Sequence, residues 1–212
     1  MYKKVLLALA SVIAITTMAV PANAATTPVI PSISAAAWWH WALETPAATN
    51  PVLDTTGARC GVNQAGPIFF LAGTFGGDAE RTCTISSSKT LFFPIVNSSY
   101  GAFLNDPWNT RTVDYARTQA AAGLAGATFA VKLDGATVPT VHEKSIPTFI
   151  KLPEDNVFGA TEADIPGLLL IPFVDEGDYA TLSNLSKGAH TLVFSNATSN
   201  GAIHVTYHLN IV

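Results

Sequence analysis

Beyond residue 66 the chain is a succession of short apolar runs separated by turn residues, and this pattern restricts its fold more than any other feature. The runs are rich in β-branched and aromatic residues and recur roughly every 8 to 15 residues. Such spacing is too short for alternating strands and helices, and it predicts a mainly β fold: an antiparallel sandwich of jelly-roll type with one or two short helices. The expected strands are 67–73, 82–85, 90–97, 127–138, 147–152, 167–174, 179–185, 190–196 and 202–212.

Turn and cap residues refine this pattern. Asp134-Gly135 divides the run 127–138 and is the strongest short signal for a β-hairpin. Two other segments, 32–43 and 110–126, are predicted to be helical. For the second, Thr110 is the candidate N-cap and Gly123 or Gly126 the candidate end.

The N-terminus has the pattern of a secretory signal peptide. Lys3 and Lys4 precede an apolar stretch over 5–20, and small residues follow at 22–24, where a signal peptidase cleaves. About 15 uninterrupted apolar residues are fewer than the roughly 20 that span a bilayer, which argues against a membrane anchor. We therefore expect a signal peptide over 1–24 and one secreted domain, periplasmic or extracellular, over 25–212. Its first part, 25–50, should form a leader and a short helix that packs on the rest.

The charge of the chain restricts the classes of partner that it can bind. The formal net charge is −4, and loss of the two lysines with the signal peptide takes it to −6. No basic stripe survives, so a nucleic-acid partner is not expected, because phosphate binding needs clustered Lys and Arg. Charged residues make up 12% of the chain, so Ser, Thr, Asn and Gly must supply much of the polar surface, as in many extracellular β proteins.

Cys60 and Cys83 are the only cysteines. In an exported chain an isolated pair is expected to form a disulfide, and closing a loop of about 24 residues stabilises by about 3–4 kcal/mol in the chain-entropy model. A redox or metal site would need a C-x-x-C motif or nearby histidines, and neither is present. We expect this disulfide to hold the strand 67–73 against the strand that contains Cys83.

His204 and His208 are the strongest candidates for metal ligands, because on a helix they would share one face. The surrounding residues alternate, however, which indicates a strand with both histidines on its polar face. Four residues along a strand span about 13 Å, too far for both rings to hold one ion. The sequence therefore predicts no metal site and no cofactor.

Carboxylates gather in two segments, and we expect both to be solvated turns: Glu154, Asp155, Asp175, Glu176 and Asp178. Oxygen-rich loops of this kind can bind calcium, but the spacing matches no EF-hand. Two of the five could instead act as the acid and nucleophile of a glycosidase.

Two further patterns carry little weight. Ser86 and Lys89 have the S-x-x-K spacing of some acyl-transfer enzymes, but the segment is predicted to be a turn between strands rather than the start of a helix. Asn97, Asn184 and Asn196 fit the N-glycosylation sequon.

The aromatic residues offer the remaining functional lead. A set of rings could form a stacking platform for sugars, whose CH faces pack on aromatic rings: Trp38, Trp39, Trp41, Trp108, Tyr100 and Tyr115. Alternatively, these rings fill the core or cover the ends of the sandwich. In the helix 32–43 we expect Trp38 and Trp41, three residues apart, to dock on the body of the protein.

Two long segments are similar to a group of secreted bacterial proteins. The group shares a Trp-rich start, an N-P…D-x-T-G…C…Q-x-G-P-x-x-F-L-A-G-T core and an R-x-C…F-F-P-x-x-N segment, which this chain carries over 38–97. The ending over 185–212 resembles the closing G-x-H-T-L-x-F…V-T-Y-H-L hairpin of the group. The resemblance implies export and a β architecture, and it assigns no catalytic residue.

Together these observations predict a secreted, non-enzymatic binding or structural protein of the cell envelope or extracellular space, with a polysaccharide or envelope component as partner. Carbohydrate is the ligand class to test first, through the tryptophans. Two alternatives stay open. One is a secreted glycosidase that uses a carboxylate pair. The other is a self-assembling subunit, because the alternating C-terminal strand could add to a neighbour's sheet edge.

Overall fold

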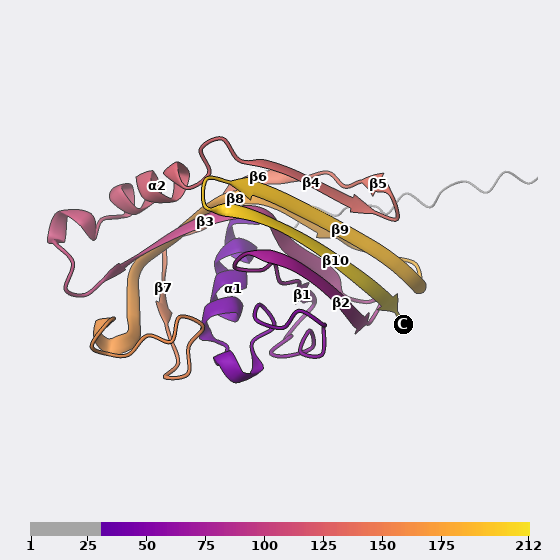
Figure 1. Cartoon of the computed structure of the whole chain (residues 1–212), viewed down its shortest axis with the longest axis horizontal. Helices are drawn as coiled ribbons and strands as arrows, with labels where there is room; N and C mark the ends of the chain where they lie inside the picture. The colour runs from indigo at the N-terminus through magenta and orange to yellow at the C-terminus, as the bar shows by residue number, and fades with distance from the viewer. Residues whose placement is uncertain (1–30) are drawn as a thin grey trace, which may run out of the picture.

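The computed structural model describes residues 31–212, which form two five-stranded sheets, two α-helices and three short 3-10 turns (Figure 1). The predicted signal peptide, 1–24, and the first residues of the leader lie outside the described residues. The predicted mainly β sandwich with short helices is confirmed.

The first sheet, sheet A, has the strand order β1-β3-β8-β6, and β7 also pairs with β8. Its strands are β1 Ile68–Phe70, β3 Thr90–Phe103, β6 Val141–Lys144, β7 Thr148–Lys151 and β8 Leu169–Leu182. The second, sheet B, has the order β2-β10-β9-β4-β5. Its strands are β2 Gly77–Ile85, β4 Thr128–Leu133, β5 Ala136–Thr137, β9 Gly188–Thr198 and β10 Gly201–Ile211.

The pairing is antiparallel except at two edges, where β1 lies parallel to β3 and β2 lies parallel to β10. The prediction of an antiparallel sandwich did not include these pairs. They arise because the chain crosses from β1 in sheet A to β2 in sheet B and then returns to β3. Neighbours in a parallel pair are therefore separated by a long connection, as this pairing requires.

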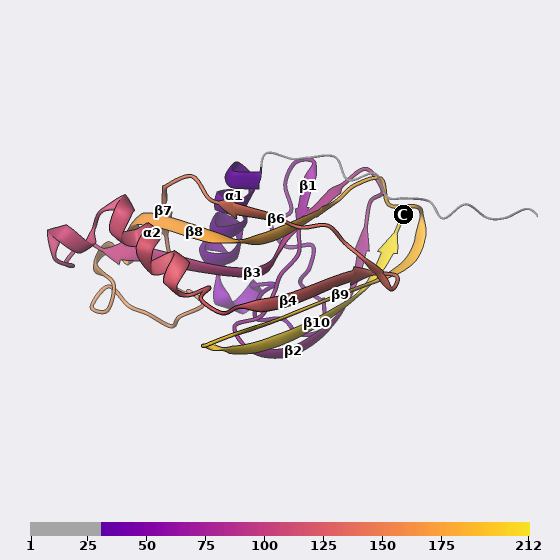
Figure 2. The same cartoon turned by 90° about the horizontal axis from the view of Figure 1, so that it is seen from above.

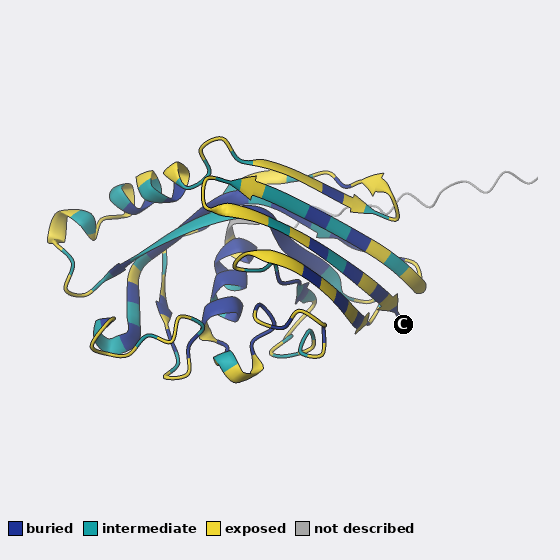
Figure 3. Ribbon diagram, viewed as in Figure 1, coloured by how far each residue is buried: buried dark blue, intermediate teal, exposed yellow. Residues whose placement is uncertain are grey.

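The main core fills the space between the two sheets. Along β10, Val205, Tyr207, Leu209 and Ile211 are buried and their neighbours face outward, so exposed and buried bands alternate along this strand (Figure 3). The predicted alternation is thus confirmed, as is the Asp134-Gly135 hairpin, which joins β4 to β5 with positive φ at both residues. β10 lies inside its sheet, between β9 and β2, which removes the reason for proposing it as a donated edge strand.

Helix α1, Pro31–Glu44, packs on the face of sheet A opposite to sheet B and lies below β3 and β8 in Figure 1. The prediction that Trp38 and Trp41 dock on the body is confirmed, and Trp39 is buried as well. Trp39 packs edge-on against Phe173 of β8, with ring centroids 5.4 Å apart. The loop after α1 covers the side of the helix that the sheet leaves open, since the Trp41 indole donates to the Val62 carbonyl.

Helix α2, Val113–Ala122, packs on the other face of sheet A, beyond the end of sheet B (Figure 2). Its N-cap is Thr112, whose hydroxyl accepts a hydrogen bond from the Tyr115 amide, rather than the predicted Thr110. Thr110 instead ends a 3-10 turn, Trp108–Thr110. The predicted end of the helix at Gly123 is confirmed.

The acidic segment 174–178 is not a solvated turn, which corrects the prediction. It lies within β8, a single 14-residue strand that replaces the two strands expected over 167–174 and 179–185. Asp175 is buried on the α1 side with Phe173 and Tyr179. On the other face of β8, Val174 packs under α2, and Ala180 and Leu182 face sheet B. Charged residues are tolerated here because partners on neighbouring strands pair with them. The other acidic segment, with Glu154 and Asp155, does lie in an exposed loop.

The predicted disulfide between Cys60 and Cys83 is confirmed, with Cα atoms 6.2 Å apart. It joins the loop before β1 to β2 of sheet B. The expectation that it holds the strand 67–73 against the strand of Cys83 is wrong, because β1 pairs with β3 in the other sheet.

Candidate functional site

The loop between α1 and β1 contains the first part of the pattern shared with the bacterial group, and its polar residues hold the loop together. Asn50 is buried; its amide donates to the carbonyls of Ala42 and Thr45 at the end of α1. Asp54 accepts from the backbone of Thr56 and Arg59, and Gln64 bonds both backbone groups of Phe70. These motif residues are structural, since their polar groups are used within the loop.

Arg81 is the largest fully buried side chain. Its guanidinium donates to the carbonyls of Asp54 (2.6 Å), Ala72 (2.8 Å) and Gly73 (2.9 Å), and lies 5.4 Å from the centre of the Tyr207 ring. It therefore joins the loop to the crossover between β1 and β2. The alternation of β2 points residue 81 inward, but nothing in the sequence indicates that an arginine there is paired with carbonyls.

A cleft of about 260 Å³ lies where β1 stops pairing with β3. Trp38 and Trp39 of α1 form part of its wall on one side, and the crossover loop around Phe75 contributes another part. The remaining walls come from the middle of β3, the C-cap of α2 and the tip of the β9–β10 hairpin. From these elements the residues are Pro94, Ile95, Val96, Asn97, Ser98, Gly123, Asn196, Thr198, Asn200, Gly201, Ala202 and Ile203.

The lining of this cleft combines aromatic rings with neutral hydrogen-bonding groups. Three asparagines, Ser98 and two threonines supply amides and hydroxyls, and no lining residue is charged. The Asn196 amide donates to the Ile95 carbonyl at 2.6 Å, which holds the hairpin against β3. An uncharged, hydrogen-bonding cleft with aromatic walls suits a neutral, hydroxyl-rich ligand better than a phosphate or a carboxylate.

The structure divides the predicted aromatic platform. Trp38 and Trp39 line the cleft but are otherwise buried, and Trp41 packs against Phe70 in the core. Trp108 is 79% exposed, and neither it nor Tyr100 lines the cleft. Tyr100 of β3 lies beneath α2 and contacts Tyr115 of that helix, with ring centroids 5.6 Å apart. The hypothesis that all these rings form a single stacking surface is therefore wrong, because the helix and the core separate them.

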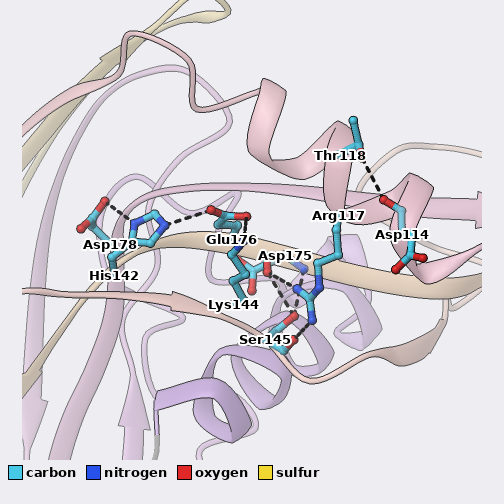
Figure 4. Close-up of polar contacts among 9 residues, drawn as sticks. All are labelled: Asp114, Arg117, Thr118, His142, Lys144, Ser145, Asp175, Glu176 and Asp178. Carbon is cyan, nitrogen blue, oxygen red and sulfur yellow. Dashed lines mark hydrogen bonds and ion pairs between the residues drawn. The ribbon is translucent and has the colours of Figure 1, made fainter.

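A charged cluster lies on sheet A, one strand away from the cleft (Figure 4). His142 of β6 is placed between two carboxylates of β8, with its Nε2 3.0 Å from Glu176 and its Nδ1 3.1 Å from Asp178. Lys144 forms an ion pair with the second Glu176 oxygen at 3.3 Å. Hydrogen bonds that His142 donates to the carboxylates of Glu176 and Asp178 raise its pKa. Burial by itself would raise the pKa of Glu176. Hydrogen bonds from His142 and Lys144 have the opposite and larger effect, so the pKa of Glu176 is lowered.

Asp175 lies on the opposite face of β8, fully buried under α1. Burial raises the pKa of its carboxyl to about 6, although the Tyr179 hydroxyl donates to it. The Trp39 indole also faces this carboxyl and lowers its pKa, without reaching the geometry of a hydrogen bond. Arg117 of α2 contacts only the backbone here, at the carbonyls of Asp175 and Ser145 (Figure 4). The five carboxylates considered for a glycosidase are thus divided among an exposed loop and the two faces of β8.

Asp175→Asn should stabilise the protein at neutral pH. An unfolded Asp ionises near pH 4, so the folded state binds more protons between about pH 4 and pH 6, and stability falls as the pH rises through this window. The rise of the pKa from 3.8 to about 6 corresponds to about 3 kcal/mol at neutral pH. We expect the substitution to raise the free energy of unfolding by about 1–3 kcal/mol at pH 7.5 and by little at pH 4, as measured by urea denaturation. An equal change at both pH values would contradict this interpretation.

The histidines considered for a metal site lie as predicted, on the exposed side of β10. His208 pairs with Glu80 of β2 at 2.8 Å. Within residues 31–212 no group of three His, Cys, Asp or Glu side chains could hold a metal ion. No helix in this part of the chain is long and apolar enough to cross a membrane.

The structure also shows where the S-x-x-K spacing and the sequon asparagines lie. Ser86 and Lys89 lie in the turn between β2 and β3, as predicted. Two of the three sequon asparagines, Asn97 and Asn196, line the cleft. Besides Trp38 and Trp39, these sequons were the sequence signal for this site, and they suggested a different chemistry.

Compared with known proteins, the chain matches no family model, no curated protein and no solved structure. The resemblance to the group of secreted bacterial proteins therefore stays a prediction.

Proposed function

We propose that the protein is an exported, non-enzymatic binding protein that holds a neutral carbohydrate in the cleft between α1, β3 and the β9–β10 hairpin. The observation that carries the proposal is the lining of the cleft, in which tryptophan and phenylalanine rings accompany amides and hydroxyls without any charged group. Sugars present both apolar CH faces and hydroxyls, and such a lining complements both. The volume of about 260 Å³ is at the small end of ligand sites, which suits one or two sugar units.

Two features support the non-enzymatic and exported parts of the proposal. His142 and Glu176 form an ion pair on sheet A, outside the cleft, so their charges neutralise each other. The cleft itself has no carboxylate in its lining. The signal-like sequence over 1–24 and the Cys60–Cys83 disulfide fit an oxidising compartment outside the cytoplasm.

The test is a tryptophan-fluorescence titration of the mature protein with a panel of neutral mono- and oligosaccharides, because Trp38 and Trp39 lie in the cleft wall. We expect a saturable change with one class of sugar. Phe75→Ala should weaken that binding about tenfold or more, because Phe75 is a 57% exposed ring of the cleft.

Trp108→Ala is the matched control, since it removes an exposed aromatic ring that does not line the cleft. It should leave the affinity unchanged. Equal losses in both variants, or binding of charged sugars alone, would count against the cleft as a neutral-sugar site.

A further inference from the structure

A second cavity, of about 400 Å³, lies on the α1 face of sheet A. Its lining is mainly apolar and comes from α1, the later part of β3, the start of β8 and the loop before β8, and it includes Gly101, Phe158, Ala160, Asp164, Leu170 and Phe173. The carboxylate of Asp164 is engaged within its own loop, where it accepts from the amide and the hydroxyl of Thr161. The cavity thus offers an apolar surface with few polar groups.

The wall of this cavity contains small residues. Gly101 packs closely against β8, because a Cβ atom there would lie 2.9 Å from both the Leu170 Cβ and a ring carbon of Phe173. Ser99 and Ala160 are also small. Phe158 is 53% exposed, which places one wall of the cavity at the surface.

The apolar cavity adjoins the polar cleft. β3 lines the cleft with residues 94–98 and the cavity from residue 99 onward. Phe75 of the cleft and Phe158 of the cavity, both more than half exposed, have ring centroids 6.3 Å apart. Deeper in, Trp39 of the cleft contacts Phe173 of the cavity. The two spaces therefore share a rim and a wall.

We propose that the ligand is a neutral glycolipid, with its sugar in the cleft and the first part of its alkyl or acyl chain in the apolar cavity. This inference rests on the proposed function, because it takes the sugar site as given. A free sugar would leave the apolar cavity unused, and a simple fatty acid would bring a carboxylate to a cleft that has no cationic side chain. An uncharged amphiphile matches both linings.

The experiment is calorimetric titration of the mature protein with alkyl glycosides that carry one sugar and chains from methyl to octyl, each below its micelle concentration. Burial of each methylene should raise the affinity about fourfold until the cavity is full. Ala160→Leu should abolish this dependence on chain length but preserve binding of the methyl glycoside. Ala163→Leu, an exposed residue of the same loop that does not line the cavity, is the matched control and should behave like the wild type.

The outcomes separate the two proposals. If octyl glycoside binds no tighter than methyl glycoside, or if Ala160→Leu keeps the dependence on chain length, the glycolipid proposal is overturned and the sugar site stands. If octanol binds as tightly as octyl glycoside, the sugar contributes nothing, and both the neutral-sugar function and the glycolipid proposal fail.

Discussion

Arg81→Met should cost about 4 kcal/mol of folding free energy, the largest loss we expect from a single substitution. Methionine keeps much of the volume but removes the donor of the Asp54 and Gly73 carbonyls, and it leaves the Ala72 carbonyl with the Tyr207 hydroxyl alone. An unsatisfied buried polar group costs about 1–3 kcal/mol. The measurement is urea denaturation of the oxidised protein, followed by tryptophan fluorescence.

Arg111→Met is the control for this prediction. Arg111 is exposed and donates to one carbonyl, that of Leu104, so its loss should change stability by no more than about 0.5 kcal/mol. If Arg81→Met costs less than about 1 kcal/mol, the guanidinium does not hold the loop and the crossover together in the way described.

Gly57→Ala should destabilise the protein by about 3 kcal/mol. Gly57 has a φ of +90°, and its Cβ would lie 2.5 Å from the Thr82 carbonyl oxygen and 2.7 Å from the Thr82 nitrogen. Both atoms belong to the backbone, so neither can rotate away. The neighbouring residues Thr55 and Thr56 accept hydrogen bonds from the amides of Glu80 and Thr82, and a shift of residue 57 would disturb these bonds along the edge of β2.

Gly61→Ala provides the comparison within the same loop. A Cβ at position 61 meets no atom within 4 Å, and the φ of Gly61 is not in the positive range. This substitution should be neutral or slightly stabilising, because alanine restricts the unfolded chain. Similar unfolding midpoints for the two variants would show that residue 57 does not need its close approach to β2.

The six rings predicted to form one sugar-binding surface lie in separate parts of the structure. The six rings were considered as one surface, but α1 turns Trp41 into the core and α2 lies between Tyr100 and the solvent. Only Trp38 and Trp39 reach the cleft, where they meet Phe75 and the asparagines of two distant strands. Sequence spacing could not place these residues together, because more than 100 residues separate Asn196 from α1.

The prediction that the acidic segment of β8 is a turn was wrong for a related reason. Asp175, Glu176, Gly177 and Asp178 have low β propensity and are typical of turns. In the folded protein, His142 and Lys144 of the neighbouring strand pair with Glu176, and Tyr179 donates to Asp175. Gly177 is required by close packing, since a Cβ there would lie 2.5 Å from the Val96 carbonyl oxygen. His142, Lys144 and Val96 come from other strands, so local propensity could not predict this strand.

The sequence by itself determined the features that depend on neighbouring residues. Alternation along 202–212 predicted the buried face of β10, Asp134-Gly135 predicted a hairpin, and the single cysteine pair predicted the disulfide. The tertiary structure alone decided which strands pair in parallel, which side of α1 is covered, and where Arg81 finds its acceptors. It also created the cleft and the apolar cavity, because both form where α1, β3 and distant loops meet. Periodicity and turn chemistry act over a few residues, whereas these sites depend on contacts between segments that only folding brings together.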